Sequence, residues 1–329
     1  MEAPSNVLNI PSADHGRVPL VTVAICTRNR ADFLKTAVES VLSQIRTDAE
    51  ILIIDNASTD ETPAVIAEFA RLNPCVRVWR EEELGLSAAR NAALRRARGT
   101  YVIFLDDDAS GEPGWLAQYA ELFSSPPVSE LAGAGGSVFP RYDTALPPWV
   151  RPDAHKFDWS DRAQPFKPRG GPWGCNFAVH RERALAVGGF DPALGRKGSG
   201  MGAHEESELI EKLRRAGGCL WWLPQARIQH HVAAHRLTFR TQYRNAFTDG
   251  RSAALYRMRL LPAGLGRNLF RAGRAMVAPF QCAAGLGAAL LILPFCPLHR
   301  AASLTFRAAR NAGFGLQLLH SPPPSARLP

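Results

Sequence analysis

Three consecutive aspartates, Asp106, Asp107 and Asp108, directly follow the apolar segment 101–105. Like charges this close raise one another's pKa unless a cation neutralises them. Carboxylate oxygens favour Mg²⁺ or Mn²⁺, which take further ligands from water and substrate phosphates. In an extended chain Asp106 and Asp108 point to one side and Asp107 to the other. The segment predicts a metal site with Asp108 as a ligand and Asp106 touching the metal or a ribose; a solvated acidic turn is the alternative.

Two further groups of titratable residues lie in the second half of the chain. Glu205 and Glu206 open a predicted helix, where one carboxylate can act as a general base; acids that only complement the helix dipole are the alternative. His230 and His231 lie on a predicted strand, so one ring faces the sheet and the other faces away. Beside the aspartates, one of these rings becomes a candidate third metal ligand.

Several familiar sites are excluded by their missing residues. The HEESE segment lacks the second histidine of a zinc protease, and DNASTD lacks the glycine and terminal glutamate of an EF-hand. The turn 27–32 contains no glycine, which argues against an NAD fingerprint and against the phosphate loop of a nucleotidyltransferase. The six cysteines lie far apart without a CxxC pair, so we interpret them as reduced thiols of a cytosolic protein.

Apolar strands alternate with amphipathic helices in the first half of the chain. Continuous apolar strands of this kind indicate a mostly parallel sheet covered by helices, which binds ligands at the carboxyl ends of its strands. Thr27, Asp55 and the three aspartates follow such strands, and Asp55 is well placed to accept hydrogen bonds from a base or ribose. We expect strands at 21–26, 50–55, 76–79 and 101–105, a helical stripe from Phe33 to Ile45, a helix at 62–72, and a helix capped by Ser87 and stopped by Gly99.

The second half is less regular. Residues 124–174 are rich in proline, glycine and tryptophan, and no regular structure is predicted for them. Order is expected to return with a strand at 176–179, a helix at 205–216, and short strands at 220–223 and 228–232.

Five segments and the His230 strand, in this order, carry a resemblance to a known family. The segments are VAICTRNR, IIDNASTD, ELGLSAARNAALRRARGTYVIFLDDD, WGCNFAVHRERALAVGGFD and AHEESEL. Over residues 21–249 the chain resembles the inverting family 2 glycosyltransferases of the GT-A fold, a Rossmann-like sheet flanked by helices. The resemblance implies a nucleotide-diphospho-sugar donor whose diphosphate is clamped by Mn²⁺ or Mg²⁺.

The resemblance also implies roles for individual residues. It places Glu206 at the catalytic base, although the choice between Glu205 and Glu206 stays open because this chain has Glu where Asp is frequent. Direct displacement at the anomeric carbon needs such a base and no protein nucleophile. The donor would be held by Thr27, Arg28, Asp55, Arg90, Asp106 and Asp107, and the metal by Asp106, Asp108 and His230.

Trp173 and Asn176 follow a glycine-rich stretch in the irregular half. We expect both side chains to line the cleft for the donor sugar and the acceptor. A tight turn packed by Trp173 is the alternative.

The basic charge of the protein belongs to its C-terminal part. From Arg236 onward there are thirteen arginines and one acid, Asp249, so residues 1–235 carry about −3 of the total charge of +9. Twenty-five uncharged residues, 275–299, are long enough to span a bilayer. Prolines interrupt them and arginines flank both ends, which favours a re-entrant or interfacial segment at an anionic membrane; a buried helical pair is the alternative. Nucleic acid is not expected, because no aromatic-basic interleaving accompanies the arginines.

The sequence thus predicts four parts and one activity. The parts are a flexible lead-in without a secretory signal at 1–19, a nucleotide-sugar-binding half at 20–125, an acceptor and catalytic half at 126–249, and a basic, hydrophobic, membrane-associating extension at 250–329. The activity is metal-dependent inverting transfer of a hexosyl or related group to a saccharide or lipid-linked hydroxyl acceptor. We expect it in cell-envelope polysaccharide or glycolipid synthesis, at the cytoplasmic face of the cell membrane. A nucleotidyltransferase and a degenerate membrane-bound sugar-binding protein are the alternatives.

Overall fold

The chain divides into two compact units. Residues up to Arg141, with His155–Ala193 and Glu205–His231, form the first unit; Tyr142–Ala154, Leu194–His204 and the residues from Val232 onward form the second. The expected division by function at residues 125 and 249 remains a prediction. The lead-in expected at 1–19 lies almost wholly outside the described residues. The computed structural model describes residues 18–168, 170–197, 202–262, 264–293 and 297–320.

The first half of the sheet is parallel, as predicted. Strand β1 pairs with β2 on one side and with β4 on the other, and β2 pairs with β3, always in parallel. All seven residues of β2 are buried, which agrees with a strand covered on both faces. These strands are β1 (Val21–Thr27), β2 (Ala49–Asp55), β3 (Val76–Arg80) and β4 (Tyr101–Leu105).

The second half of the sheet adds antiparallel strands. Strand β8 pairs antiparallel with β4, β6 pairs antiparallel with β8, and the order continues to β9 and β5, with β7 also pairing with β9. The sheet therefore extends beyond the parallel core without a break. The added strands are β5 (Ala109–Gly111), β6 (Leu131–Tyr142), β7 (Gln164–Pro165), β8 (Asn176–His180) and β9 (Cys219–Val232).

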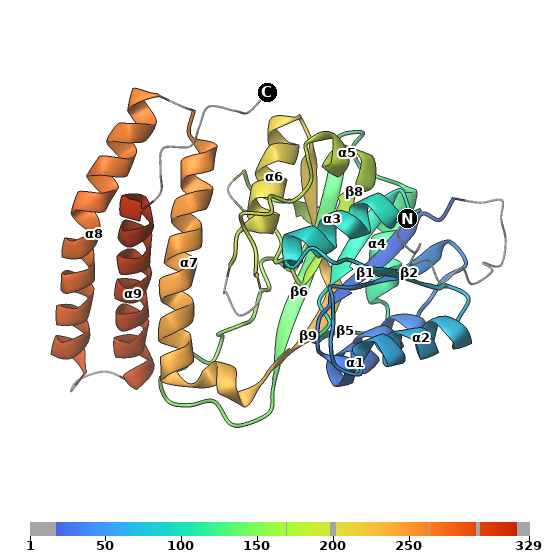
Figure 1. Cartoon of the computed structure of the whole chain (residues 1–329), viewed down its shortest axis with the longest axis horizontal. Coiled ribbons are helices and arrows are strands. Elements are labelled where there is room, and N and C mark those ends of the chain that lie inside the picture. Colours follow the sequence, from blue (N-terminus) through green and yellow to red (C-terminus); the bar gives the residue numbers. More distant parts are fainter. Residues whose placement is uncertain (1–17, 169, 198–201, 263, 294–296, 321–329) are drawn as a thin grey trace, which may run out of the picture. The chain divides into compact units, whose positions relative to one another are not determined.

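Helices cover both faces of this sheet (Figure 1). Successive residues of β1 point to opposite sides: Val23 and Ile25 pack with α1, α2 and α4, whereas Ala24 packs with α3, α5 and α6. The first unit is therefore a three-layer α/β/α structure, in agreement with the predicted fold class. Its helices are α1 (Ala31–Leu42), α2 (Thr62–Leu72), α3 (Leu86–Arg96), α4 (Trp115–Ser124), α5 (Arg181–Ala186) and α6 (Glu205–Arg215).

Three local predictions were wrong. Strand β6 lies in the stretch for which no regular structure was expected, because its glycines suggested a loop. Gly136 is needed for close approach: a Cβ there would lie 1.9 Å from the carbonyl oxygen of Ala226. Strand β9 runs through Pro224 as one strand where two were predicted. Ser87 lies inside α3, whose N-cap is Gly85 in a conformation (φ 141°) that side chains rarely adopt.

The second unit is helical. In Figure 1 its three long helices lie side by side, preceded by the short 3₁₀ helix η1 (Ala234–Leu237). Helix α9 packs so closely on α7 that a Cβ added at Gly313 would lie 1.9 Å from the carbonyl oxygen of Phe247. The three are α7 (Phe239–Leu260), α8 (Leu265–Ile292) and α9 (Leu298–His320).

Helix α8 carries the predicted hydrophobic segment. Gly266–Ile292 is long and apolar enough to cross a membrane: its most apolar 18-residue window has a mean hydropathy of 1.8, yet only 11% of that window is buried. The alternative of a buried helical pair is therefore not supported. Residues 294–296 of the predicted segment lie outside the described residues.

Candidate active site

The carboxyl ends of the parallel strands bring the predicted polar residues together. Thr27 ends β1 and lies opposite Asp55, which ends β2. The aspartate run begins directly after β4, the other neighbour of β1. The Thr27 hydroxyl donates a hydrogen bond of 2.8 Å to Asp107 Oδ2. The edge of the sheet at which ligands were expected is thus lined by these side chains.

Asp106, Asp108 and His230 offer ligand atoms that lie within 4.8 Å of one another. The sheet explains this meeting: β5 pairs antiparallel with β9, so that Ala109 lies opposite His230. The Nε2 atom of His230 is 3.2 Å from Asp108 Oδ1. The neighbouring His231 ring packs against Phe33 instead, as strand alternation requires, while the His231 backbone N–H donates to the Asp108 carbonyl at 2.8 Å.

These three side chains fit a divalent metal ion. Asp108 is almost fully buried, and its side chain is 6% exposed, whereas that of Asp106 is 31% exposed toward solvent. Two carboxylates and one imidazole form a mixed oxygen and nitrogen donor set that suits a divalent cation. The more exposed Asp106 leaves room for further ligands from water or substrate.

Arg30 was not singled out in the sequence, although it closes the CTRNR segment. Its Nη1 atom lies 2.7 Å from Asp107 Oδ1 and 2.9 Å from Asp108 Oδ2. Burial raises the pKa of Asp107 to about 6, and the Asp108 charge adds to this, while Arg30 and the Thr27 hydroxyl oppose it. Arg30 thus supplies part of the positive charge that the aspartate run requires.

Arg90 lies beneath the site rather than on its wall. Its side chain is 2% exposed, with Nη1 2.8 Å from Glu205 Oε1 and Nη2 3.1 Å from Asp106 Oδ1. Nη2 also donates to the Gly174 carbonyl at 2.7 Å. With its guanidinium enclosed in this way, the predicted direct contact with a diphosphate is not supported. Arg90 instead connects a predicted metal ligand to the acidic start of α6.

The two glutamates of α6 lie in different environments. Glu205 is 5% exposed and pairs with Arg90, whereas Glu206 is partly exposed. Gly174 brings the backbone close to Arg90 and Glu206, since a Cβ there would lie 3.2 Å from Arg90 Nη2 and 3.6 Å from Glu206 Cδ. The structure therefore brings the acidic pair to the same region as the aspartate run.

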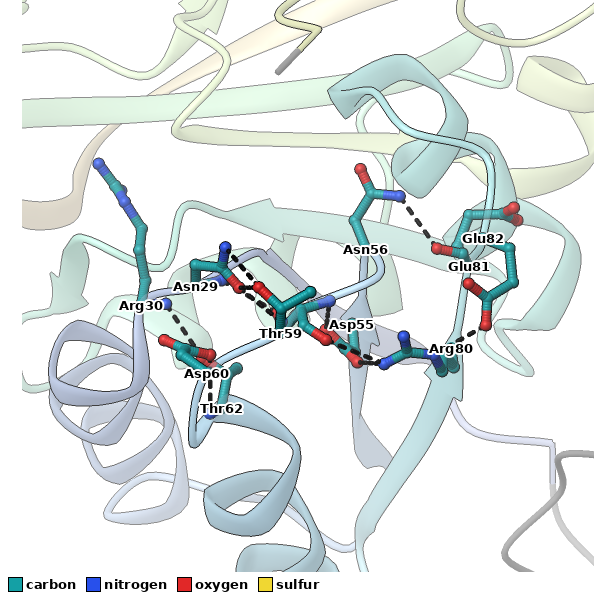
Figure 2. A network of polar contacts seen from close by, with 11 residues as sticks. Asn29, Arg30, Asp55, Asn56, Thr59, Asp60, Thr62, Arg80, Glu81 and Glu82 are labelled. Carbon is teal, nitrogen blue, oxygen red and sulfur yellow. Dashed lines mark hydrogen bonds and ion pairs between the residues drawn. The ribbon is translucent and has the colours of Figure 1, made fainter. Parts of the chain in front are cut away.

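Asp55 belongs to a polar network at the end of β2 (Figure 2). Its Oδ1 accepts a hydrogen bond of 3.0 Å from the Ser58 N–H, and its Oδ2 pairs with Arg80 Nη1 at 2.7 Å. Asn56 donates to the Glu81 carbonyl at 3.1 Å, and Arg30 N–H donates to the Thr62 hydroxyl at 3.0 Å. These contacts fix the loop after β2 at the carboxyl edge of the sheet.

Arg28 follows β1 and is partly exposed. Its Nε atom is buried, and it has no hydrogen-bond partner among the described residues. A buried donor without an acceptor costs free energy, so a ligand that accepts this hydrogen bond would be stabilised.

Asn176 serves the fold rather than the predicted sugar cleft. It is fully buried, its Oδ1 accepts hydrogen bonds from Trp115 Nε1 and the Tyr119 hydroxyl, and its Nδ2 donates to the Ser137 and Ala226 carbonyls. These four contacts engage the whole amide, so the predicted sugar contact is not supported.

Trp173 remains available to a ligand. Its side chain is 38% exposed while its ring stacks on Phe157 at 5.1 Å. The stacking agrees with the packed turn that was the alternative, and the predicted sugar contact stays a prediction.

Comparisons with known proteins agree with this geometry. Residues 22–184 match the model of glycosyl transferase family 2. The chain is 26% identical over 238 residues to the glucosyl-dolichyl phosphate glucuronosyltransferase of Haloferax volcanii, a match that covers 70% of this chain and 75% of the relative. It is 39% identical over 104 residues to the chondroitin synthase of Escherichia coli, covering 32% of this chain and only 15% of that relative.

The fold also matches solved structures. The mannosyltransferase PcManGT from Pyrobaculum calidifontis, in complex with GDP-Man and Mn²⁺, superposes with a TM-score of 0.61 at 18% identity, covering 97% of this chain and 91% of that chain. This likeness shows the GT-A fold. The family match, rather than the fold alone, favours a glycosyltransferase over the nucleotidyltransferase alternative. The family match and the GT-A fold show that the chain carries a family 2 glycosyltransferase domain and is a glycosyltransferase.

Proposed function

We propose that this enzyme uses Mn²⁺ to transfer a sugar, with inversion, from a nucleotide-diphospho-sugar to a hydroxyl acceptor. The observation that carries the proposal is the meeting of Asp106, Asp108 and His230 within 4.8 Å at the carboxyl edge of the sheet. The Mn²⁺ of the PcManGT complex supports the choice of metal. When bound, such an ion neutralises the negative charge that develops on a leaving diphosphate.

The donor nucleoside is proposed to lie along the ends of β1 and β2. Thr27 and Asp55 are at this edge, and the buried, unpartnered Nε of Arg28 can donate to a ligand oxygen. Arg30 already contacts Asp107 and Asp108. Its guanidinium can also pair with phosphate oxygens that approach these aspartates. Nucleotides in solved relatives, GDP-Man in PcManGT and UDP in S. aureus TarS, agree with this donor class.

Glu206 is proposed as the general base. Glu205 is buried and held by Arg90, so its task is to position the arginine and, through it, Asp106. Glu206, one residue further along the same helix turn, is more exposed, as a group that meets the acceptor must be. In a single displacement it takes the proton of the acceptor hydroxyl while that oxygen attacks the anomeric carbon and the bond to the diphosphate breaks.

The acceptor is proposed to be a saccharide or a lipid-linked hydroxyl in cell-envelope polysaccharide or glycolipid synthesis. The Haloferax relative is named for a dolichyl phosphate substrate, and the Escherichia relative is named as a polysaccharide synthase. The apolar, mostly exposed helix α8 supports work at a membrane, and the flanking arginines suit an anionic cytoplasmic surface.

The test is donor turnover with a panel of nucleotide sugars and MnCl₂. We expect one donor to be hydrolysed slowly without acceptor, with the rate lost on chelation and in Glu206→Gln, which keeps donor binding. The matched control is Glu211→Gln, in the same helix and paired with Arg215. Full donor turnover by Glu206→Gln would remove Glu206 from the role of base.

A further inference from the structure

Two cavities follow one another along the three long helices of the second unit. The first has a volume of about 580 Å³ and is apolar throughout, with walls that include Trp149, Phe239, Leu286, Leu290 and Ala302. Leu290 is also 72% exposed, so this cavity opens toward the uncovered apolar side of α8. A cavity of this size and composition suits a hydrocarbon chain.

The second cavity has a volume of about 730 Å³ and a polar wall. Its charged lining consists of Arg274 from α8, Arg307 and Arg310 from α9, and Asp249 from α7. Three guanidinium groups against one carboxylate leave a positive surplus. Arginines recognise phosphate oxygens well, because each guanidinium presents a planar pair of donors.

The two cavities are neighbours along the same helices. Thr305 lines the first and Phe306 the second. On α7, Phe239 of the first cavity lies three residues, about 4.5 Å of helix rise, before Gln242 of the second. An elongated ligand with an apolar part and an anionic part can therefore occupy both.

Of the charged side chains that line the second cavity, Arg274 and Arg307 are available to a ligand. Asp249 is paired with Arg310, and its Oδ1 is 3.1 Å from His204 Nε2. Burial would raise the pKa of Asp249, but the neighbouring His204 and Arg310 side chains hold it below its ordinary value, so the carboxylate stays charged. Among the described residues no carboxylate pairs with Arg274 or Arg307; the Arg274 guanidinium lies over the Phe314 ring at 5.2 Å.

We propose that these two cavities form one site for a phosphate-bearing lipid, with a hydrocarbon chain in the apolar cavity and the phosphate at Arg274 and Arg307. A soluble phosphate would leave the apolar cavity unfilled, and an apolar ligand would leave the arginines unpaired. The apolar face of α8, which opens into the first cavity, gives a lipid an entrance from a bilayer. The site goes beyond the proposed sugar transfer, which uses residues of the first unit alone.

The test uses the full chain in neutral detergent and measures retention of a dioleoyl phosphatidic acid by native mass spectrometry. We expect saturable binding of one lipid, weakened about tenfold or more in the double variant Arg274→Gln/Arg307→Gln. The matched control, Arg240→Gln/Arg257→Gln, removes the same charge from exposed positions of α7 outside both cavities and should bind normally. Ala302→Trp, which fills the apolar cavity, should also weaken binding.

Two further arms define the ligand. Dioleoylglycerol, which lacks the phosphate, and inorganic phosphate, which lacks the chains, should each compete poorly. Equal losses in the two arginine double variants, or equal binding of dioleoylglycerol, would overturn the proposal. Donor hydrolysis is measured on the same samples, and we expect the lipid-site variants to retain it. If the wild type itself does not hydrolyse the donor, that result counts against the proposed sugar transfer and does not bear on the lipid site. Circular dichroism verifies that each variant is folded.

Discussion

Arg90 and Glu205 form a buried ion pair of 2.8 Å, although they are 115 residues apart in the sequence. The same guanidinium lies 3.1 Å from Asp106, so one side chain connects the aspartate run after β4 to the acidic start of α6. Three phenylalanine rings, of Phe104, Phe177 and Phe190, lie within 6 Å of its centre. The fold thus holds the two acidic halves of the site together through one arginine in an apolar setting.

Replacing Arg90 tests this connection. Arg90→Gln leaves two carboxylates near a buried site without their cation, so we expect the free energy of unfolding to fall by about 3–5 kcal/mol. Urea denaturation followed by tryptophan fluorescence measures the loss. Arg95→Gln, on the exposed side of the same helix, should change stability by less than about 1 kcal/mol. Equal, small effects of both variants would show that Arg90 does not hold the site together.

The two glutamates of α6 are expected to respond differently to the same substitution. Glu206→Gln should lower kcat by about 10²–10⁴-fold with little loss of stability, because it removes a proton acceptor from a partly exposed position. Glu205→Gln should instead lower the free energy of unfolding by about 1–3 kcal/mol, because Arg90 loses a charged partner. Transfer kinetics and urea denaturation on both variants separate the roles; the reverse pattern would exchange them.

Asn176 is expected to be a stability residue. Asn176→Ala leaves the Trp115 N–H and the Tyr119 hydroxyl without their shared acceptor in the core, so we expect a loss of about 3 kcal/mol or more. Asn73→Ala, which removes one amide hydrogen bond to the Phe69 carbonyl at the end of α2, should cost about 1 kcal/mol. If the Asn176 variant kept full stability but lost donor affinity, the sugar contact predicted from the sequence would be restored.

His180 is expected to make stability depend on pH. Burial, assisted by the Arg183 charge and opposed by Glu182, lowers its pKa below the ordinary 6.5. Below about pH 6.5 the unfolded chain therefore binds a proton that the folded protein refuses, and the free energy of unfolding falls as the pH falls. His180→Gln should flatten this part of the profile, whereas His235→Gln, at an exposed position, should not. Parallel profiles for the wild type and His180→Gln would contradict the shift.

The sequence was most informative where local pattern and chemistry coincide. Strands β1, β2 and β4 are buried on both faces, and their apolar composition places their boundaries to within one residue. The grouping of Asp106, Asp108 and His230 agrees with strand alternation and with the family resemblance. The local sequence pattern does not show which distant residue a side chain contacts. The positions of Arg30 against the aspartates and of Arg90 against Glu205 depend on contacts across the fold.

Other features could not be predicted because the same residues are compatible with two different structural roles. The glycines of β6 are typical of loops, yet they are required where the neighbouring backbone comes as close as Ala226 does to Gly136. Asn176 is a polar residue in a glycine-rich stretch, which suggested a ligand contact, while the structure uses its amide to satisfy four buried groups. Only tertiary structure distinguishes such internal roles from binding.

The most direct test of the central claim is a titration of Mn²⁺ into the protein with UDP or GDP present, followed by electron paramagnetic resonance. We predict that the wild type binds one ion more tightly with nucleotide than without it. Asp108→Asn and His230→Gln should each weaken this binding by about tenfold or more, while Asp60→Asn, an exposed acid on the loop after β2, should leave it unchanged. Wild-type Mn²⁺ affinity in both Asp108→Asn and His230→Gln would contradict the assignment of the metal site.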